Sequence, residues 1–454
     1  MGQQIESLAR FAAETQLEDI PIPVREHAKR VLLDTLGVIL GGSARPEVVA
    51  LRNRLTANNS TGATVYAPGA PVQDARTAAM LNGIAGRAIE LCEGLRLASG
   101  QAAIQILPGV LAVGEQFKAS GKTLLVALVS GYEVAARLGL AFTPRTLAHQ
   151  NGQAMMLAAA AAGARMRGLD AEQVSLAMRI AAILMLTPSY TNTAAGATAL
   201  NVAGGMAGFA GAFAPDLAHA GFEAQPDAIE EALGKMVGAG FDPTHLTDGL
   251  GAGWEITRNY FRLHACCNPI HSALDALDAA LAVLRPRAED IERIEFATFK
   301  FASVMCNPSP ANYFASKYSL PHAAAVMVVR GRTDHRAIDD AALRDPAIAT
   351  VRARVSVHED GAMSARVPAD KPAQVTLALK DGRRHTHAVS SHRGDFRAPY
   401  TDNELREKFR DLAAEVLTRE GVSQMENAID RCEHLHSVGD LAAIVGRYQK
   451  PGRP

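Results

Sequence analysis

The chain of 454 residues is 48% hydrophobic and 20% charged, which excludes a disordered protein and allows a core that needs no disulfide or metal. Its 46 basic and 47 acidic side chains give a net charge of −1, so we expect neither a nucleic-acid-binding surface nor a polybasic membrane contact. Five cysteines show no pairing pattern, and the first residues lack the pattern of a signal peptide, so we expect a cytoplasmic protein.

Apolar residues repeat at helical spacing from the N-terminus to about residue 268. Val24, Ala28, Val31 and Leu32 form the first clear stripe. Similar stripes predict helices over 74–92, 103–117, 122–139, 150–167, 171–187 and 199–220. The runs at 154–164 and 201–214 are small and apolar on more than one face, which is typical of helices buried among other helices. The run at 154–164 is about half as long as a bilayer span, so we expect no membrane contact.

Past residue 290 the apolar spacing changes to two. The alternation predicts strands over 291–299, 351–357 and 373–379, and Asp381-Gly382 indicates a hairpin turn into a further strand. A helix is expected over 322–330. The last fifty residues return to helical spacing, with Asp402 as the expected N-cap.

These patterns predict a mainly α protein with two domains. Residues 1–268 and 402–454 form a large all-α helical domain, and residues 269–401 form a smaller α+β lid domain that interrupts it.

His149 is the first candidate for chemistry. The common nicotinamide, phosphate-loop and zinc-hydrolase motifs are absent from the sequence, so we expect neither a nicotinamide or ATP site nor a metal site. His149 precedes the Ala-rich run, and a helix N-terminus lowers the pKa of a nearby histidine, which favours the neutral imidazole that a general base needs. The alternative is a histidine that caps the helix and has no catalytic role.

A second group of polar side chains lies in residues 260–271. Arg262, His264 and His271 occur there within ten residues. The guanidinium of Arg262 suits bidentate binding of a carboxylate, and a partly buried salt bridge explains it equally well. Cys266 and Cys267 are expected to be small buried thiols rather than a disulfide.

Six segments resemble motifs of the MmgE/PrpD family and occur in the order that the family shows. They are 30–37 (RVLLDTLG), 78–83 (AAMLNG), 158–169, 200–205 (LNVAGG), 266–275 (CCNPIHSALD) and 317–322 (KYSLPH). The resemblance implies a helical domain with a smaller α+β lid, usually in a homodimer. It also implies lyase or isomerase chemistry on small polycarboxylates without a cofactor.

Several site positions depart from the family pattern. His149 and His271 match histidines of the family. Residues 87–94 (RAIELCEG) stand where the family has His-Ala-x-Asp-Phe-Asp-Asp-Thr, and Gln101 stands where it has the histidine of a His-Pro pair. Arg262 replaces a lysine, and His322 stands where many members have tyrosine. The lysine that precedes Asn201 in the family is missing, because no lysine occurs between residues 122 and 235.

The hypothesis that follows is a hydro-lyase acting on a small hydroxy-di- or tricarboxylate. His149 would take the proton next to a carboxylate, and His322 or Glu90 would protonate the leaving hydroxyl. Arg262 would bind a carboxylate. Gln101 would orient the ligand, and His271 and Asn201 are further predicted substrate-binding residues.

Two alternatives stay open. An epimerase or isomerase of a small carboxylate would use bases on two faces, with His149 opposite His322. A catalytically degenerate member of the family would bind a carboxylate without converting it, and the changed site residues favour that alternative. The missing lysine removes one cation from the site, which also suggests a substrate with fewer carboxylates than methylcitrate.

Overall fold

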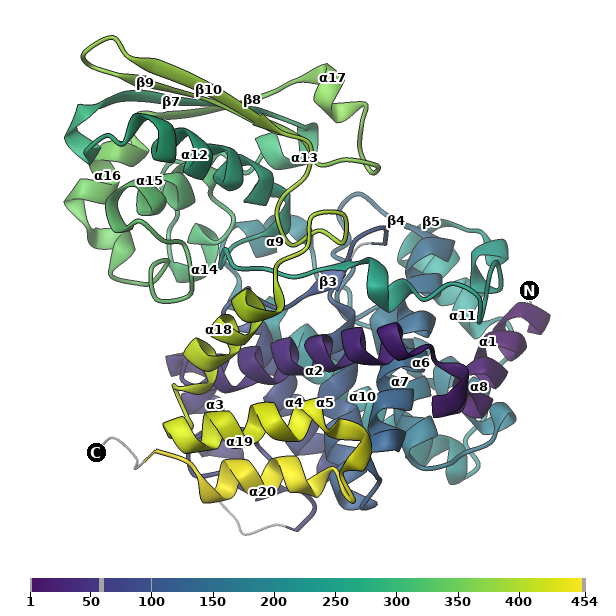
Figure 1. Ribbon diagram of the computed structural model, residues 1–454. Helices are drawn as coiled ribbons and strands as arrows, with labels where there is room; N and C mark the ends of the chain where they lie inside the picture. The colour runs from purple at the N-terminus through teal and green to yellow at the C-terminus, as the bar shows by residue number, and fades with distance from the viewer. Residues whose placement is uncertain (1, 57–60, 99, 451–454) are drawn as a thin grey trace. The chain divides into compact units, whose positions relative to one another are not determined.

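The computed structural model describes residues 2–56, 61–98 and 100–450 of the chain. These residues form two compact units (Figure 1). The first, called the helical unit below, comprises residues 1–189, 199–259 and 401–454. The second, called the α+β unit, comprises residues 190–198 and 260–400.

The helical unit is built almost entirely of helices, which confirms the prediction of a mainly α protein. Its helices are α1 (Gly2–Glu14), α2 (Ile22–Gly42), α3 (Pro46–Leu55), α4 (Ala75–Arg87), α5 (Ala102–Gln116), α6 (Gly121–Ala141), α7 (Ala154–Met166), α8 (Ala171–Ile183), α10 (Val202–His219), α11 (Ala228–Glu230), α18 (Asp402–Ala413), α19 (Arg419–Asp430) and α20 (Gly439–Arg447). Short antiparallel pairs join β1 (Ala63–Thr64) to β2 (Val72–Gln73) and β4 (Phe142–Pro144) to β5 (Gly238–Phe241). β3 (Gly94–Leu95) follows α4, and β6 (Asn259–Tyr260) lies at the boundary between the units.

Side-chain caps determine where several of these helices begin. Asp74 accepts hydrogen bonds from the backbone N–H groups of Arg76 and Thr77 at the start of α4. Ser120 and Asp170 cap α6 and α8 in the same way. Each cap satisfies backbone donors that have no partner inside the helix, so these polar residues fix the beginning of an otherwise apolar segment.

Glycines let α10 pack tightly against its neighbours in the helical core. A Cβ atom on Gly83 of α4 would lie 2.4 Å from the carbonyl oxygen of Gly204 in α10. A Cβ on Gly163 of α7 would lie 1.8 Å from the carbonyl oxygen of Gly211, also in α10. The backbones of these helices are therefore in direct contact, which brings α4, α5 and α7 together around α10.

Helix α6 is long and apolar enough, by length and composition alone, to cross a membrane. However, 89% of its most apolar window is buried within the protein. Its neighbours in the helical unit are α2, α5 and α7. Its hydrophobic surface is thus accounted for by helix packing, as expected for a core helix.

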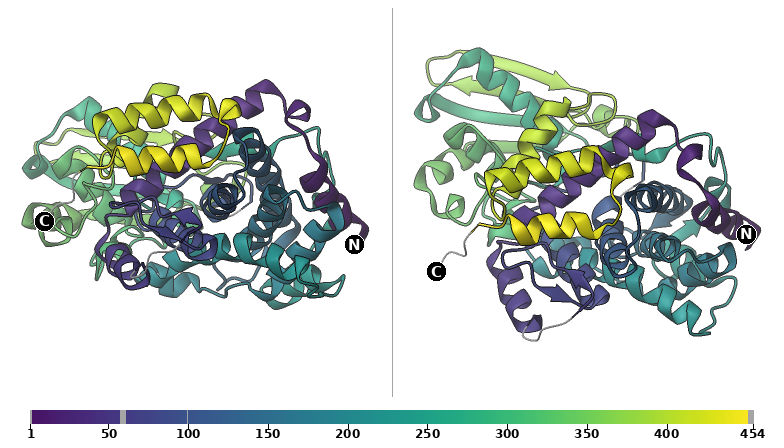
Figure 2. Two further views of the ribbon diagram at one scale, coloured as in Figure 1. Left: turned by 90° about the horizontal axis from the view of Figure 1, so that it is seen from below. Right: turned by 60° about the horizontal axis from the view of Figure 1, so that its bottom comes forward.

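The C-terminal helices complete the helical unit. α18 and α19 lie beside α2, although about 370 residues separate them in sequence, as the views in Figure 2 show. The α2–α18 contact explains why the last fifty residues carry an apolar stripe: Phe409 and Leu412 are almost completely buried.

The α+β unit contains one four-stranded sheet with the order β10-β9-β7-β8. Its strands are β7 (Ile291–Thr298), β8 (Val355–Glu359), β9 (Ala373–Leu379) and β10 (Arg384–Val389), and its helices are α9 (Tyr190–Ala194), α12 (His271–Leu284), α13 (Lys300–Ser303), α14 (Tyr313–Ser316), α15 (Leu320–Arg330), α16 (Pro346–Arg352) and α17 (Gly361–Ser364). β9 pairs antiparallel with β7 and β10, and β8 is parallel to β7. α12 packs on β9 and β10, and α15 packs on α12 and α16 (Figure 1).

Three local predictions need correction. The strand predicted over 351–357 begins only at Val355, because Asp345 caps a helix that Pro346 starts and that runs to Arg352. The N-cap of α18 is Thr401 rather than Asp402, and its side chain forms a capping box with Glu404. The helix predicted over 74–92 ends at residue 87, and the residues after it form a turn.

Candidate functional site

Four segments of the helical unit come together around His149. They are the C-terminal end of α4, the turn after it, the N-terminus of α5 and the turn that precedes α7. Glu90, in the turn after α4, has a φ of +54°, a left-handed conformation that is strained for a residue with a side chain. Such strain persists only where surrounding contacts hold it in place.

Arg87 supplies those contacts. Its Nη2 donates a hydrogen bond to Oε2 of Glu90 at 3.0 Å, and its Nη1 donates to Oε1 of Gln101 at 3.2 Å and to Sγ of Cys92 at 3.1 Å. Arg87 is 0% exposed and Glu90 is 2% exposed. The two form a buried ion pair, which is stable only because each charge has its partner.

A chain of side-chain amides continues from Arg87 to the turn that holds His149. Oε1 of Gln101 also accepts from Nδ2 of Asn151 at 2.9 Å. Gln105 donates to Oδ1 of Asn151 at 3.1 Å and accepts from the backbone N–H of Gly152 at 2.7 Å. Because the oxygen of Gln101 receives two donors, the NH2 group of this side chain faces away from Arg87.

The His149 ring is held in a definite tautomer. Nδ1 accepts a hydrogen bond from the backbone N–H of Asn151 at 3.3 Å, so the ring proton is on Nε2. Burial and the nearby charge of Arg87 lower the pKa of His149 to about 3, and Glu90 opposes them. The imidazole is therefore neutral at pH 7.

The cause of that neutrality differs from the predicted one. α7 begins at Ala154, so His149 lies in the turn before the N-cap rather than at the helix start. Burial, not the helix dipole, dominates the shift. The tautomer also presents Nε2 as a hydrogen-bond donor, whereas the basic lone pair on Nδ1 faces a backbone N–H. This arrangement suits stabilisation of negative charge better than the predicted role as general base.

Arg262 and His271 lie in the α+β unit and share a backbone acceptor. Nη1 of Arg262 donates to the carbonyl oxygen of Cys266 at 3.3 Å, and Nε2 of His271 lies 3.0 Å from the same oxygen. Nη2 of Arg262 donates to the hydroxyl of Tyr260 at 3.3 Å. Both side chains are almost fully buried, and burial holds the pKa of His271 well below its usual range.

Two cysteines and three histidines lie close to Arg262 in the α+β unit. Cys266 and Cys267 are buried thiols that form no disulfide, as predicted. His271 packs between the rings of His264 and His392, at 5.2 and 5.4 Å between ring centroids. Among the described residues, no group of three or more histidine, cysteine or acidic side chains is arranged to hold a metal ion.

His322 lies in the first turn of α15 in the α+β unit. Its Nδ1 accepts from Nη1 of Arg352 at 3.0 Å. Burial and the charges of Arg352 and Lys317 lower its pKa to about 4, so the ring is neutral at pH 7 and is a poor acid. Its Nε2 is buried and has no hydrogen-bond partner among the described residues. Buried polar atoms without a partner are uncommon and often mark functional positions.

Asn201 ends the short helical turn that precedes α10 in the helical unit. It is 3% exposed, and its Oδ1 has no hydrogen-bond partner among the residues that the structure describes. The predicted role of Asn201 in binding a ligand stays a prediction, and this buried acceptor is compatible with it.

The predicted residues thus fall into separate sets. Glu90, Gln101 and His149 are connected in the helical unit, through Arg87 and Asn151. Arg262 and His271 are connected in the α+β unit through the Cys266 carbonyl. The residues that sequence reasoning missed are Arg87, Asn151 and Gln105 as connecting groups. The sequence showed that Arg87 replaces the histidine of the family motif and that Asn151 lies beside His149. It could not predict the hydrogen bonds that these two residues form.

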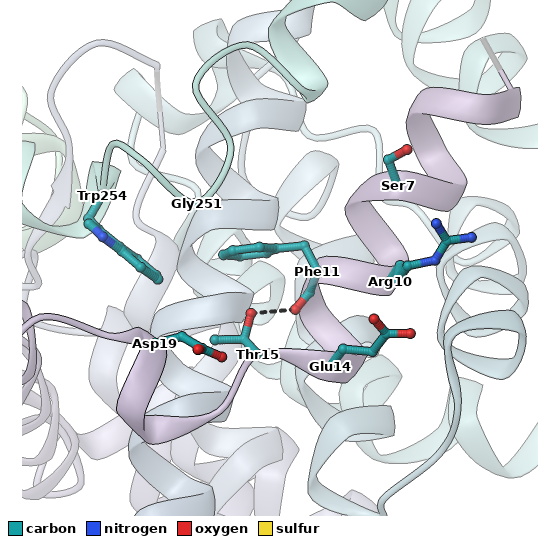
Figure 3. A pocket seen from close by; sticks show the side chains of 8 residues that line it. All are labelled: Ser7, Arg10, Phe11, Glu14, Thr15, Asp19, Gly251 and Trp254. Atoms are coloured by element: carbon teal, nitrogen blue, oxygen red, sulfur yellow. Dashed lines mark hydrogen bonds between the residues drawn. The ribbon is translucent and has the colours of Figure 1, made fainter.

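A cavity of about 490 Å3 in the helical unit contains none of these residues (Figure 3). Its lining is Ser7, Arg10, Phe11, Glu14, Thr15, Asp19, Gly251 and Trp254. The ring centroids of Phe11 and Trp254 lie 5.9 Å apart with the ring planes tilted by 46°, and Thr15 donates to the carbonyl oxygen of Phe11 at 2.6 Å. The aromatic pair joins α1 to the loop that carries Trp254, which is a structural role.

Comparison with known proteins defines the class to which this fold and these residues belong. Residues 6–243 match the MmgE/PrpD N-terminal domain, and residues 264–435 match the MmgE/PrpD C-terminal domain. The chain belongs to the MmgE/PrpD family.

Relatives of known name resemble the chain over nearly its whole length. A cis-aconitate decarboxylase-like protein, oryM, of Aspergillus oryzae is 26% identical over 98% of this chain and 97% of its own. The cis-aconitate decarboxylase of Mus musculus is 24% identical over 97% of this chain and 93% of its own. The cis-aconitate decarboxylase of Aspergillus terreus is 22% identical over 96% of this chain and 95% of its own.

Proposed function

We propose that the protein is a lyase that needs no cofactor and acts on a small hydroxy-dicarboxylate, hydroxy-tricarboxylate or related acid by proton transfer next to a carboxylate. The observation that carries the proposal is the neutral, donor-oriented imidazole of His149 beside the buried Arg87–Glu90 pair. Membership of the MmgE/PrpD family and the lyase names of the relatives support the same class of chemistry.

The chemistry requires stabilisation of the charge that develops when a proton leaves the carbon next to a carboxylate. The Nε2–H of His149 can donate to this developing enediolate oxygen, and burial strengthens such a hydrogen bond. Glu90 would supply the carboxylate that takes this proton and would return it to the leaving hydroxyl, which departs as water. Gln101, with its NH2 group turned away from Arg87, orients the acid. Arg262 would bind a carboxylate, and His271 and Asn201 would contact the substrate. His322, which is a poor acid, would donate a hydrogen bond from Nε2.

Decarboxylation is the second candidate, because the relatives are named cis-aconitate decarboxylases. Loss of CO2 leaves a carbanion that the protein must stabilise and protonate, which uses the same donors. Release of CO2 separates this reaction from dehydration, and deuterium entering recovered substrate without either product indicates epimerisation.

The first prediction concerns His149. Incubation of a panel of small hydroxy-di- and tricarboxylates and their unsaturated derivatives in D2O should show deuterium incorporation or product by NMR. Replacement of His149 by Ala should lower the rate by about 100-fold or more, because loss of one donor to a developing oxyanion costs about that much. The matched control is His219→Ala, which removes an exposed histidine in the last turn of α10.

Equal rates for the wild type and His149→Ala would contradict the assignment. Binding of these acids without conversion by the wild type would instead favour a carboxylate-binding member of the family without lyase activity.

A further inference from the structure

Helix α5 is not capped by the side chain of its own N-cap residue. The N-cap position is Gln101, and its side chain forms no capping hydrogen bond. In α4, α6 and α8, by contrast, the N-cap residue is an aspartate or a serine whose side chain accepts from the first turn of its own helix. Glutamine is not among the residues favoured at this position. The backbone N–H groups that begin α5 therefore need an acceptor from elsewhere in the chain.

Glu93, in the turn that follows α4, supplies an acceptor. Its Oε1 accepts a hydrogen bond at 2.9 Å from the backbone N–H of Ala103, the second residue of α5. An N-cap side chain ordinarily accepts from this donor or from the next one. A carboxylate there also interacts favourably with the positive end of the helix dipole. Glu93 thus takes the capping role that the side chain at position 101 does not perform.

Further contacts within the helical unit hold the Glu93 carboxylate in place. Its Oε2 accepts from the hydroxyl of Tyr132 in α6 at 2.7 Å and from Nδ2 of Asn259 at 3.2 Å. Oδ1 of Asn259 accepts in turn from Nε2 of His27 in α2 at 2.9 Å. Glu93 is 0% exposed. Since it is fully buried and both of its oxygens are bound by protein donors, any effect of Glu93 on a reaction must pass through another residue.

Gln101 is the residue through which Glu93 can act. Its side chain is directed to the network around His149 instead of to its own helix. Oε1 of Gln101 accepts from Arg87 at 3.2 Å and from Asn151 at 2.9 Å. A serine or aspartate at position 101 that capped α5 would be bound to the helix and too short for these contacts.

We infer that Glu93 is a positioning residue of the proposed lyase: it caps α5 in place of Gln101 and so leaves the Gln101 side chain available to the network around His149. The inference rests on the proposed function, in which Gln101 orients the acid. A purely structural Glu93 would affect stability and would leave the contribution of Gln101 to the reaction unchanged.

The test is a double-mutant cycle with Glu93→Ala and Gln101→Ala, in which kcat/KM is measured for the acid that the wild type converts. Glu93→Ala should lower kcat/KM by about tenfold or more, because displacement of an orienting group is costly even when the change lies away from the chemistry. In the Gln101→Ala background the same replacement should change kcat/KM by less than about twofold, because the group through which Glu93 acts is absent.

Two variants separate positioning from a loss of stability. Glu93→Gln keeps an oxygen that can accept from Ala103, so it should retain most of the wild-type kcat/KM. Glu115→Ala removes a carboxylate near the other end of α5 that accepts from the backbone N–H and the hydroxyl of Thr64. It should lower the urea midpoint of unfolding and leave kcat/KM unchanged.

A second measurement needs no turnover. In protein labelled with 15N in its glutamine side chains, the NMR signal of Gln101 is the one that Gln101→Ala removes. This signal should shift in Glu93→Ala and stay close to its wild-type position in Glu93→Gln and Glu115→Ala. If Glu93→Ala does not fold, Glu93→Asp, which keeps the charge on a shorter side chain, takes its place in both measurements.

Equal effects of the Glu93 replacement in the two backgrounds would overturn the inference, as would a Gln101 signal that this replacement leaves unchanged. The outcome is separable from that of the proposed function. Turnover with equal effects in the two backgrounds would contradict only the inference. If no acid is converted, the proposed lyase is contradicted, and the Gln101 signal still decides whether Glu93 positions this side chain.

Discussion

Lys408, near the C-terminus, holds the turn that carries Glu90. Its Nζ donates to Oδ1 of Asp34 at 2.5 Å and to the carbonyl oxygen of Leu91 at 2.7 Å. Oδ2 of Asp34 in turn accepts from the backbone N–H of Glu93 at 3.2 Å. The pair is almost completely buried, so one charged contact connects α2, the turn after α4, and α18.

Replacement of Lys408 by Met should lower the free energy of unfolding by about 3–5 kcal/mol, because it removes the cation paired with a buried carboxylate. The double variant Asp34→Asn/Lys408→Met should recover most of this loss. Arg30→Met, which breaks an exposed pair with Asp402, should cost less than about 1 kcal/mol. Urea denaturation measures all three, and equal effects of the two single variants would contradict the role given to the buried pair.

Only part of the residue network around His149 could be predicted from the sequence. The motif pattern indicated His149, Glu90 and Gln101 as candidates, and their roles stay predictions. The hydrogen bonds of Asn151 to Gln101 and to Gln105 join residues 50 and 46 positions apart. Such contacts depend on how α5 packs against the turn before α7, which periodicity does not specify.

The contact between α7 and α10 depends on two glycines. Gly163 in α7 faces Gly211 in α10 so closely that a Cβ on Gly163 would overlap the carbonyl oxygen of Gly211, at 1.8 Å. Since the obstacle is backbone, the helices themselves would have to separate. The glycines are thus required for the distance between these helices rather than for a turn.

Gly163→Ala should lower the free energy of unfolding by about 1–3 kcal/mol, because it forces an overpacked core to move. The matched change is Gly446→Ala in α20, where a Cβ meets no atom within 4 Å. There the better helix propensity of alanine should stabilise the protein by about 0.5–1 kcal/mol. Opposite signs in chemical denaturation support the packing argument, and a loss of stability in both variants would contradict it.

The helices were predictable because their apolar stripes are long and regular. α5 and α6 begin and end within two residues of the predicted ranges 103–117 and 122–139. The segment 351–357 was predicted as a strand because Val351 and Val355 alternate with polar residues. Asp345 is the N-cap of a helix that begins at Pro346, and this helix extends into the segment. Capping residues decided the structure there, against the apolar pattern.

Buried titratable groups act on the stability of the whole protein in opposite directions. Burial lowers the pKa of five histidines from about 6.5: His149 to about 3, His322 and His392 to about 4, His271 well below its usual value, and His27 as well. Burial raises the pKa of Glu93 and of Glu133 from about 4.5 to about 7, and it also raises the pKa of Glu115. The histidines therefore contribute stability that is present above pH 6.5 and lost as the pH falls, whereas the buried acids contribute stability that is present below pH 4.5 and lost as the pH rises towards 7.

The balance of these groups predicts a stability that rises with pH up to about pH 7 and changes little above it. Between about pH 4.5 and 6.5 the unfolded chain binds roughly two more protons than the folded protein, since five histidines outweigh three acids, so stability rises with pH. Above about pH 7 the histidines are mostly neutral in both states, so this gain ends. Urea denaturation at pH 5, 7 and 8.5 should therefore show a clear increase in the free energy of unfolding from pH 5 to 7 and no comparable increase from pH 7 to 8.5. Glu93→Gln should make the rise from pH 5 to 7 steeper, because it removes an acid that the folded protein holds protonated there. Glu172→Gln, which removes an exposed acid in the first turn of α8, should leave the rise unchanged. An unchanged slope in Glu93→Gln would show that Glu93 does not titrate in this range.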